Sequence, residues 1–118
     1  MLLRTSLALL LSGGLTASTV AQPPQTNGLP VWLAAKVAEF QRLPPFNPPR
    51  SILRTQYQGK VAFHISPACC DIPSELYDEQ GVLLCFPTGG FAGGDGRCPG
   101  FLLDEGQATL VWRDARQR

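Results

Sequence analysis

The stretch SILRTQYQGKVAFHISP, residues 51–67, decides which fold the chain is expected to adopt. Both of its halves, residues 52–57 and 60–66, are rich in β-branched and aromatic side chains, and Gln58-Gly59 lies between them. Two such runs separated by two residues that suit a tight turn are typical of a β-hairpin. The sequence therefore predicts two antiparallel strands joined at Gln58 and Gly59.

The second of these strands has an alternating pattern. Val61, Phe63 and Ile65 are apolar at every second position, which predicts one buried face. His64, the single histidine of the chain, falls between them. Because successive side chains of a strand point to opposite faces, we expect His64 to be exposed.

Upstream of the hairpin, residues 30–42 have the pattern of a helix. Apolar side chains recur at helical spacing at Leu33, Val37 and Phe40. Pro30 suits the first helical position, and Pro44-Pro45 cannot continue a helix. We expect one face of this helix to be buried against a sheet.

Downstream of the first hairpin, residues 76–86 predict a second hairpin, with its turn at 78–81. Residues 88–100, TGGFAGGDGRCPG, contain too many glycines for a helix or a strand and predict a loop. A last strand is expected over 108–114, with Leu110 and Trp112 on one face. The predicted fold class is α+β: an N-terminal helix packed on a small antiparallel sheet of about five strands, with strand order left open.

Four cysteines, an even number, favour two disulfides in an exported chain. They are Cys69, Cys70, Cys85 and Cys98. Side chains of adjacent residues on an extended segment point to opposite sides, so the favoured interpretation joins Cys69 and Cys70 to different distant partners. Two disulfide pairings fit this interpretation, because either adjacent cysteine can bond to Cys85 and the other to Cys98. A strained bond between Cys69 and Cys70, with a redox role, is the alternative.

The first 21 residues have the layout of a secretory signal peptide, with Arg4, an apolar run, and small residues at Thr19 and Ala21. This segment is too polar and too short for a transmembrane helix. We therefore expect a secreted or periplasmic protein with no membrane anchor after cleavage. The rest of the chain divides into a flexible lead-in (22–28), a single small disulfide-stabilised domain (29–114) and a C-terminal tail (115–118).

The charge of the chain excludes some classes of partner. The formal net charge is +1, and the basic residues are scattered rather than gathered in a block. Nucleic acid and anionic membranes attract proteins through clustered basic residues, so neither is an expected partner. We expect an unidentified protein or cell-envelope partner.

Metal and catalytic sites are weakly supported. Zinc ligands come in close pairs, and the chain has no C-x-x-C pair. Calcium is the alternative, with Asp71, Asp78 and Asp95 as ligands on or near loops. A lone histidine, the absence of G-x-S-x-G and the small size of the domain give no catalytic constellation, so we expect no enzyme and no cofactor other than calcium.

Five motifs resemble those of a family of small exported bacterial domains. They are Y-x-G-K-V (57–61), P-x-C-C-D (67–71), L-Y-D-x-x-G (76–81), C-x-P-x-G-G (85–90) and G-D-G-x-C-P (94–99). The resemblance covers nearly all of residues 29–114. It implies an exported or periplasmic bacterial protein and assigns no catalytic residue. Gly100 departs from the family pattern, which has an acidic residue there.

The leading functional hypothesis is a non-enzymatic binding or structural domain that presents the glycine-rich loop. Loops held on rigid scaffolds often bear binding residues. The candidates are Phe86, Thr88, Phe91 and Arg97. Phe91, between glycine pairs, is predicted equally well to be exposed or to fold back over the core. A protease inhibitor that presents Phe86–Gly90 as a bait loop is a further alternative.

Overall fold

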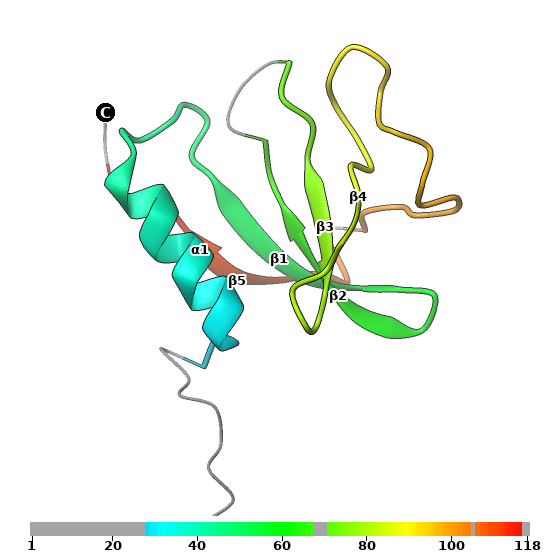
Figure 1. Ribbon diagram of the computed structural model, residues 1–118, viewed down its shortest axis with the longest axis horizontal. Coiled ribbons are helices and arrows are strands. Elements are labelled where there is room, and N and C mark those ends of the chain that lie inside the picture. Colours follow the sequence, from blue (N-terminus) through cyan, green and yellow to red (C-terminus); the bar gives the residue numbers. More distant parts are fainter. Residues whose placement is uncertain (1–27, 68–70, 105, 117–118) are drawn as a thin grey trace, which may run out of the picture.

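The structure is a computed structural model that describes residues 28–67, 71–104 and 106–116 (Figure 1). The predicted signal peptide, most of the predicted lead-in, and Cys69 and Cys70 lie outside these residues. The described chain forms one helix and five strands in the order α1 (Val31–Arg42), β1 (Ser51–Tyr57), β2 (Lys60–Ile65), β3 (Glu75–Asp78), β4 (Leu83–Cys85) and β5 (Thr109–Arg113). These elements confirm the predicted α+β class.

The five strands form one sheet in the order β4-β3-β2-β1-β5, and every neighbouring pair is antiparallel. The two hairpins supply four strands in sequence, and β5 returns to pair with β1 (Figure 1). The β1–β2 turn has positive φ at Gln58 (51°) and Gly59 (76°), as a two-residue hairpin turn of type I′ requires. The predicted hairpin and its turn are confirmed.

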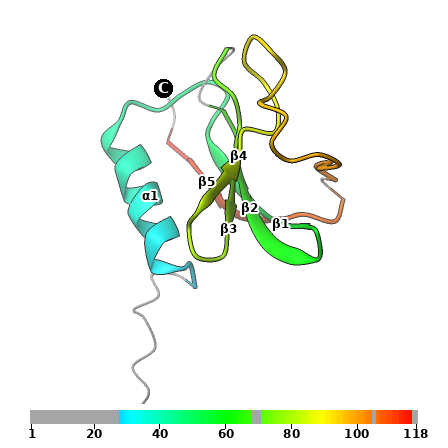
Figure 2. The ribbon, with the colours of Figure 1, turned by 45° about the vertical axis from the view of Figure 1, so that its right-hand side comes forward.

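Helix α1 covers one face of the sheet (Figure 2). Its stripe of Leu33, Val37 and Phe40 is buried as predicted. The core on this side consists of those three residues together with Ile52, Phe63, Ile65 and Tyr77 from the strands. The described residues contain no helix long and apolar enough to cross a membrane, and α1 has 12 residues.

Trp32 fixes the start of α1 on the β3–β4 turn. Its indole Nε1 donates a hydrogen bond of 2.8 Å to the carbonyl oxygen of Glu79. Its ring packs edge-on against Phe63 and tilted against Tyr77, with centroid distances of 5.7 and 5.4 Å. Gly81 has φ +87°, and a Cβ there would lie 2.7 Å from the Trp32 ring. The turn therefore approaches the helix as closely as only glycine allows.

The opposite face of the sheet is also buried, which corrects the prediction for His64. His64 is 6% exposed and stacks on Phe101, with ring centroids 6.1 Å apart. A second cluster forms on this face from Ala62, Leu76 and Cys85, packed against Tyr57, Leu84, Cys98 and Phe101. Alternation in the sequence identified the two faces of β2, but it could not show that a loop covers the second one.

The predicted common face for Leu110 and Trp112 is wrong. Ile52 pairs with Trp112 and the next residue, Leu53, pairs with Leu110, so the register skips Val111. Such a bulge breaks the alternation of side chains along a strand. Val111 and Trp112 both pack against the helix-side core, whereas Leu110 is 47% exposed.

The cysteine pairing also differs from the favoured interpretation. Cys85 and Cys98 are bonded to each other, with their Cα atoms 5.9 Å apart. This bond excludes both cross-pairings with Cys69 and Cys70. It is the single disulfide of the described residues; the second predicted disulfide involves Cys69 and Cys70, which lie outside them. The reason is geometric: the loop after β4 folds back over the end of the strand and brings Cys98 to Cys85.

A residue of the predicted C-terminal tail holds the end of α1. The Arg116 guanidinium forms a bidentate pair with Asp114, from Nε to Oδ1 at 3.0 Å and from Nη2 to Oδ2 at 2.8 Å. It also donates to the carbonyl oxygens of Gln41 (2.8 Å) and Phe40 (3.1 Å). These carbonyls belong to the last turn of the helix, which lacks the usual intrahelical N–H partners, although Phe40 also accepts from the Leu43 N–H at 3.1 Å. Arg116 therefore caps α1 from about 75 residues away.

Candidate functional site

The segment from Phe86 to Gly100, here called the glycine loop, extends from the end of β4 and contains no helix or strand. It lies on the side of the sheet opposite α1 (Figure 2). The Cys85–Cys98 disulfide closes its two ends. Cys85 is fully buried, so one anchor of the loop lies inside the second cluster.

A second tie joins Thr88 to Ser74 at the start of β3. The Ser74 N–H donates to the carbonyl oxygen of Thr88 (2.8 Å), and the Thr88 N–H donates to Ser74 Oγ (3.2 Å). The two hydroxyl oxygens are 2.7 Å apart. Ser74 is fully buried, so its hydroxyl needs these partners. Thr88, a predicted binding residue, thus has a structural contact.

A third tie is the carboxylate of Asp95. Its Oδ2 accepts from the Phe86 N–H (3.1 Å) and its Oδ1 from the Arg97 N–H (3.0 Å). The Asp95 N–H donates back to the Phe86 carbonyl at 2.9 Å. The hydrogen bond from the Arg97 N–H lowers the pKa of Asp95; partial desolvation opposes this effect, and the bond from the Phe86 N–H adds to it. The charged carboxylate of Asp95 therefore stabilises the loop from within.

Phe91 lies in the middle of this tethered segment with its side chain fully exposed, at 104% of the reference area. Of the two expectations for Phe91, the exposed one is therefore correct. Arg97 is also exposed, while Phe86 is half-buried. The structure thus places Phe91 and Arg97 at the surface, and the main chain of Phe86 and Thr88 in the ties.

The three carboxylates predicted as calcium ligands have separate roles. Oδ1 of Asp78 accepts from the N–H groups of Gln80 and Val82, each at 2.9 Å, and shapes the β3–β4 turn. Asp95 braces the glycine loop, and Asp71 is exposed. Among the described residues, no three His, Cys, Asp or Glu side chains lie close enough together to hold a metal ion. The structure does not bring these three together.

A bait-loop role for Phe86–Gly90 meets a geometric obstacle. Protease inhibitors present an extended main chain whose N–H and C=O groups pair with the enzyme. Here the N–H and C=O groups of Phe86 bond to Asp95, and those of Thr88 bond to Ser74. The main-chain groups of both residues are therefore occupied within the chain.

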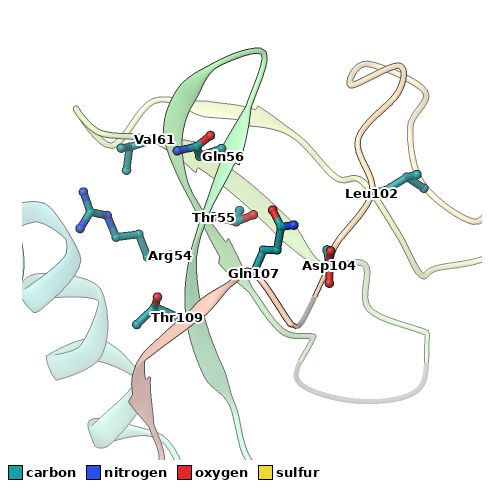
Figure 3. Close-up of a pocket in the computed structure, with 8 residues that line it drawn as sticks. All are labelled: Arg54, Thr55, Gln56, Val61, Leu102, Asp104, Gln107 and Thr109. Atoms are coloured by element: carbon teal, nitrogen blue, oxygen red, sulfur yellow. The ribbon is translucent and has the colours of Figure 1, made fainter.

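Sequence reasoning missed a polar groove at the end of the sheet. It encloses about 340 Å³ beside β1, on the side where β5 begins (Figure 3). Its lining mixes amides, hydroxyls and one charge of each sign: Arg54, Thr55, Gln56, Val61, Leu102, Asp104, Gln107 and Thr109. The groove could not have been found from the sequence, because it joins β1 to a segment about 50 residues away whose pairing partner was unknown.

Comparison with known protein families identifies the family of the domain. Residues 38–114 match the family model described as a domain of unknown function (DUF6970). This range includes the whole sheet and the end of α1. No curated protein and no solved structure matches the chain.

Proposed function

The chain belongs to the domain family of unknown function DUF6970, and from this premise we propose that it is a non-enzymatic binding domain that presents Phe91 to a protein partner outside the cytoplasm. The partner would hold an apolar pocket that receives the phenyl ring. The proposed location is supported by the disulfide and by the signal-peptide pattern of residues 1–21, since disulfides persist in oxidising compartments.

The observation that supports a binding role best is the full exposure of Phe91 on a segment with three separate ties. An exposed phenyl ring costs free energy in water, and aromatic side chains are frequent anchors at protein interfaces. Because the loop is already ordered by its ties, less conformational entropy is lost when it binds. Both effects favour recognition over a purely structural loop.

The side chains exposed on the glycine loop and on the segment beneath it suit a protein surface. Ile72, 50% exposed, lies in the segment that packs under the loop, since a Cβ at Gly89 would be 3.3 Å from the Ile72 carbonyl oxygen. Arg97 is exposed on the same loop and forms no ion pair with another described residue. Exposed apolar side chains together with an arginine on the same loop are a common composition for an interface.

Photo-crosslinking in the native host tests this proposal. A photoreactive phenylalanine analogue replaces Phe91 in the full chain, and a second chain bears it at Val82, which is 57% exposed on the β3–β4 turn. We expect one defined adduct from position 91 and none from position 82. An unlabelled competitor chain should suppress the adduct, and the Phe91→Ala competitor should not.

Two results would overturn the proposal. One is the absence of any adduct at position 91 when the labelled chain is folded and exported. The other is the same set of adducts from positions 91 and 82, which would indicate non-specific contact. A melting curve for Phe91→Ala unchanged from the parent chain establishes that the substitution acts on binding and not on folding.

A further inference from the structure

The edge strand β5 is shorter than β1, the strand with which it pairs. β5 begins at Thr109, which pairs with Arg54, whereas β1 continues to Tyr57. Residues 55–57 of β1 therefore pair with β2 on one side and, among the described residues, with no strand on the β5 side. The polar groove lies at this unpaired edge (Figure 3).

The pairing pattern identifies which main-chain groups face the edge. The Ser66 N–H donates to the Ser51 carbonyl at 2.9 Å, so Ser51 bonds toward β2. In an antiparallel pair the direction of the main-chain N–H and C=O groups alternates from one residue to the next. Those of Thr55 therefore also point toward β2, whereas those of Arg54 and Gln56 point toward β5. The Arg50 carbonyl accepts from the Asp114 N–H, on the β5 side, which agrees with this alternation.

Gln56 thus directs an N–H and a C=O into the groove. If β5 were longer, Gln107 would be the residue opposite it. Instead the Gln107 N–H donates to the Asp104 carbonyl at 3.0 Å and closes a turn. No described residue forms a hydrogen bond with the main chain of Gln56 on this side. An open donor and acceptor of this kind are a template for another strand.

Charges of opposite sign flank this template. In Figure 3, Arg54 and Asp104 lie on opposite sides of β1, with Gln56 and Gln107 between them. Neither charged residue forms an ion pair with another described residue. Oδ1 of Asp104 accepts from the Gly106 N–H at 2.9 Å, and its second oxygen accepts no hydrogen bond from another described residue.

From these observations we infer that the groove binds an extended peptide, which adds to the edge of β1 at Gln56 and places an acidic residue at Arg54 and a basic residue at Asp104. The peptide would occupy the place that β5 leaves empty, bonding through its main chain to Gln56. Strand addition gives affinity through the main chain and selectivity through alternate side chains. This site is separate from Phe91 and goes beyond the proposed function.

A display library of random octapeptides, selected on the full folded chain, tests the inference. Selection is repeated on Gln56→Pro, which removes the N–H that faces the groove but no bond toward β2. We expect enriched peptides that contain an acidic and a basic residue, and a loss of about tenfold or more in affinity for Gln56→Pro, as one lost hydrogen bond predicts. N-methylation at the central peptide residue should cause a similar loss.

Side-chain variants keep the test decisive if Gln56→Pro does not fold. Arg54→Gln and Asp104→Asn remove one charge each, and Asp104→Asn retains an oxygen for the Gly106 N–H. Each should lower the affinity for the selected peptides several-fold. Arg113→Gln should not, because Arg113 is exposed at the other end of β5. The inference is overturned if no peptide is enriched, or if all variants bind equally. It is also overturned if the Gln56 amide resonance shifts with protein concentration alone, which indicates a second copy as the occupant.

Discussion

One face of the sheet is covered by a helix, and the other by a segment without regular structure (Figure 2). On the helix side, seven buried side chains form a continuous apolar core that includes Phe40, Phe63 and Tyr77. On the loop side only Ala62, Leu76 and Cys85 form the buried cluster. The loop side adds a disulfide, a Ser74–Thr88 tie and the Asp95 carboxylate.

The difference shows how a small domain covers two faces with one helix. Apolar burial contributes free energy in proportion to area, and the loop side has little area to bury. A disulfide contributes instead by restricting the unfolded chain, so it does not depend on a large core. Apolar packing thus stabilises mainly the helix side, whereas the disulfide and the polar contacts stabilise mainly the loop side.

The largest expected effect compares one fully buried leucine from each side. Leu33→Ala on α1 should lower the free energy of unfolding by about 4 kcal/mol, and Leu76→Ala in β3 by about 2 kcal/mol. The reason is that a loop can settle into a cavity more easily than a helix can. Denaturant unfolding of both variants measures the difference. A larger loss for Leu76→Ala would show that the loop side is packed as firmly as the helix side.

Removal of the disulfide tests the ties directly. The double substitution Cys85→Ala and Cys98→Ala opens a loop with a sequence separation of 13 residues and should cost about 3 kcal/mol. Hydrogen exchange should show lost protection in residues 86–101 before α1 is affected. Uniform loss of protection across both sides would contradict the division between packing and ties.

The close approach of the β3–β4 turn to α1 gives a matched pair of glycine substitutions. Gly81→Ala adds a Cβ 2.7 Å from the Trp32 ring at φ +87° and should cost about 2 kcal/mol. Gly59→Ala has φ +76° but nothing within 4 Å, so it should cost about 1 kcal/mol from backbone strain alone. Thermal melts, with Trp fluorescence to monitor the ring, measure both. Equal losses would mean that the Trp32 contact adds nothing.

The smallest effect is the pH dependence of the polar tie on the helix side. The hydrogen bonds and charge of Arg116 lower the pKa of Asp114. A lowered carboxyl pKa in the folded state adds stability above the unfolded-state pKa, and this stability is lost as the pH falls through the folded value. The advantage of the parent chain over Arg116→Gln should therefore shrink in acid, as measured by urea midpoints from pH 7 downward.

Arg113→Gln is the control for this pH series, because Arg113 is exposed and forms no ion pair with another described residue. Its difference from the parent chain should not vary with pH. A constant difference for Arg116→Gln as well would leave only the pH-independent bonds to the helix carbonyls as the role of Arg116.

The sequence predicted the local parts of this structure. The stripe of Leu33, Val37 and Phe40 and the Gln58-Gly59 turn depend on neighbours within a few residues, and each was found as expected. The α+β class followed from the order of these elements. Strand order was not predictable, because it depends on the pairing of β5 with β1, which lie more than 50 residues apart in the sequence.

The errors concern contacts between distant segments. His64 was expected at the surface because an alternating strand cannot show what covers its second face. The bulge at Val111 and the bonds from Arg116 to α1 likewise have no local sequence signal. Of the candidate site, the full exposure of Phe91 was one of two open expectations, and the groove at Gln56 was missed because it exists only where two strands end at different places.

The bonds from Arg116 to Phe40 and Gln41 have a consequence for biosynthesis. The ribosome synthesises α1 before β5, yet two hydrogen bonds at the end of α1 come from Arg116, which follows β5, and β1 receives one neighbour from β5 itself. The nascent chain therefore cannot complete its first elements until synthesis reaches the last ones. Until residues 109–116 have been synthesised, the Gln41 carbonyl and the outer side of β1 lack hydrogen bonds that they have in the folded domain.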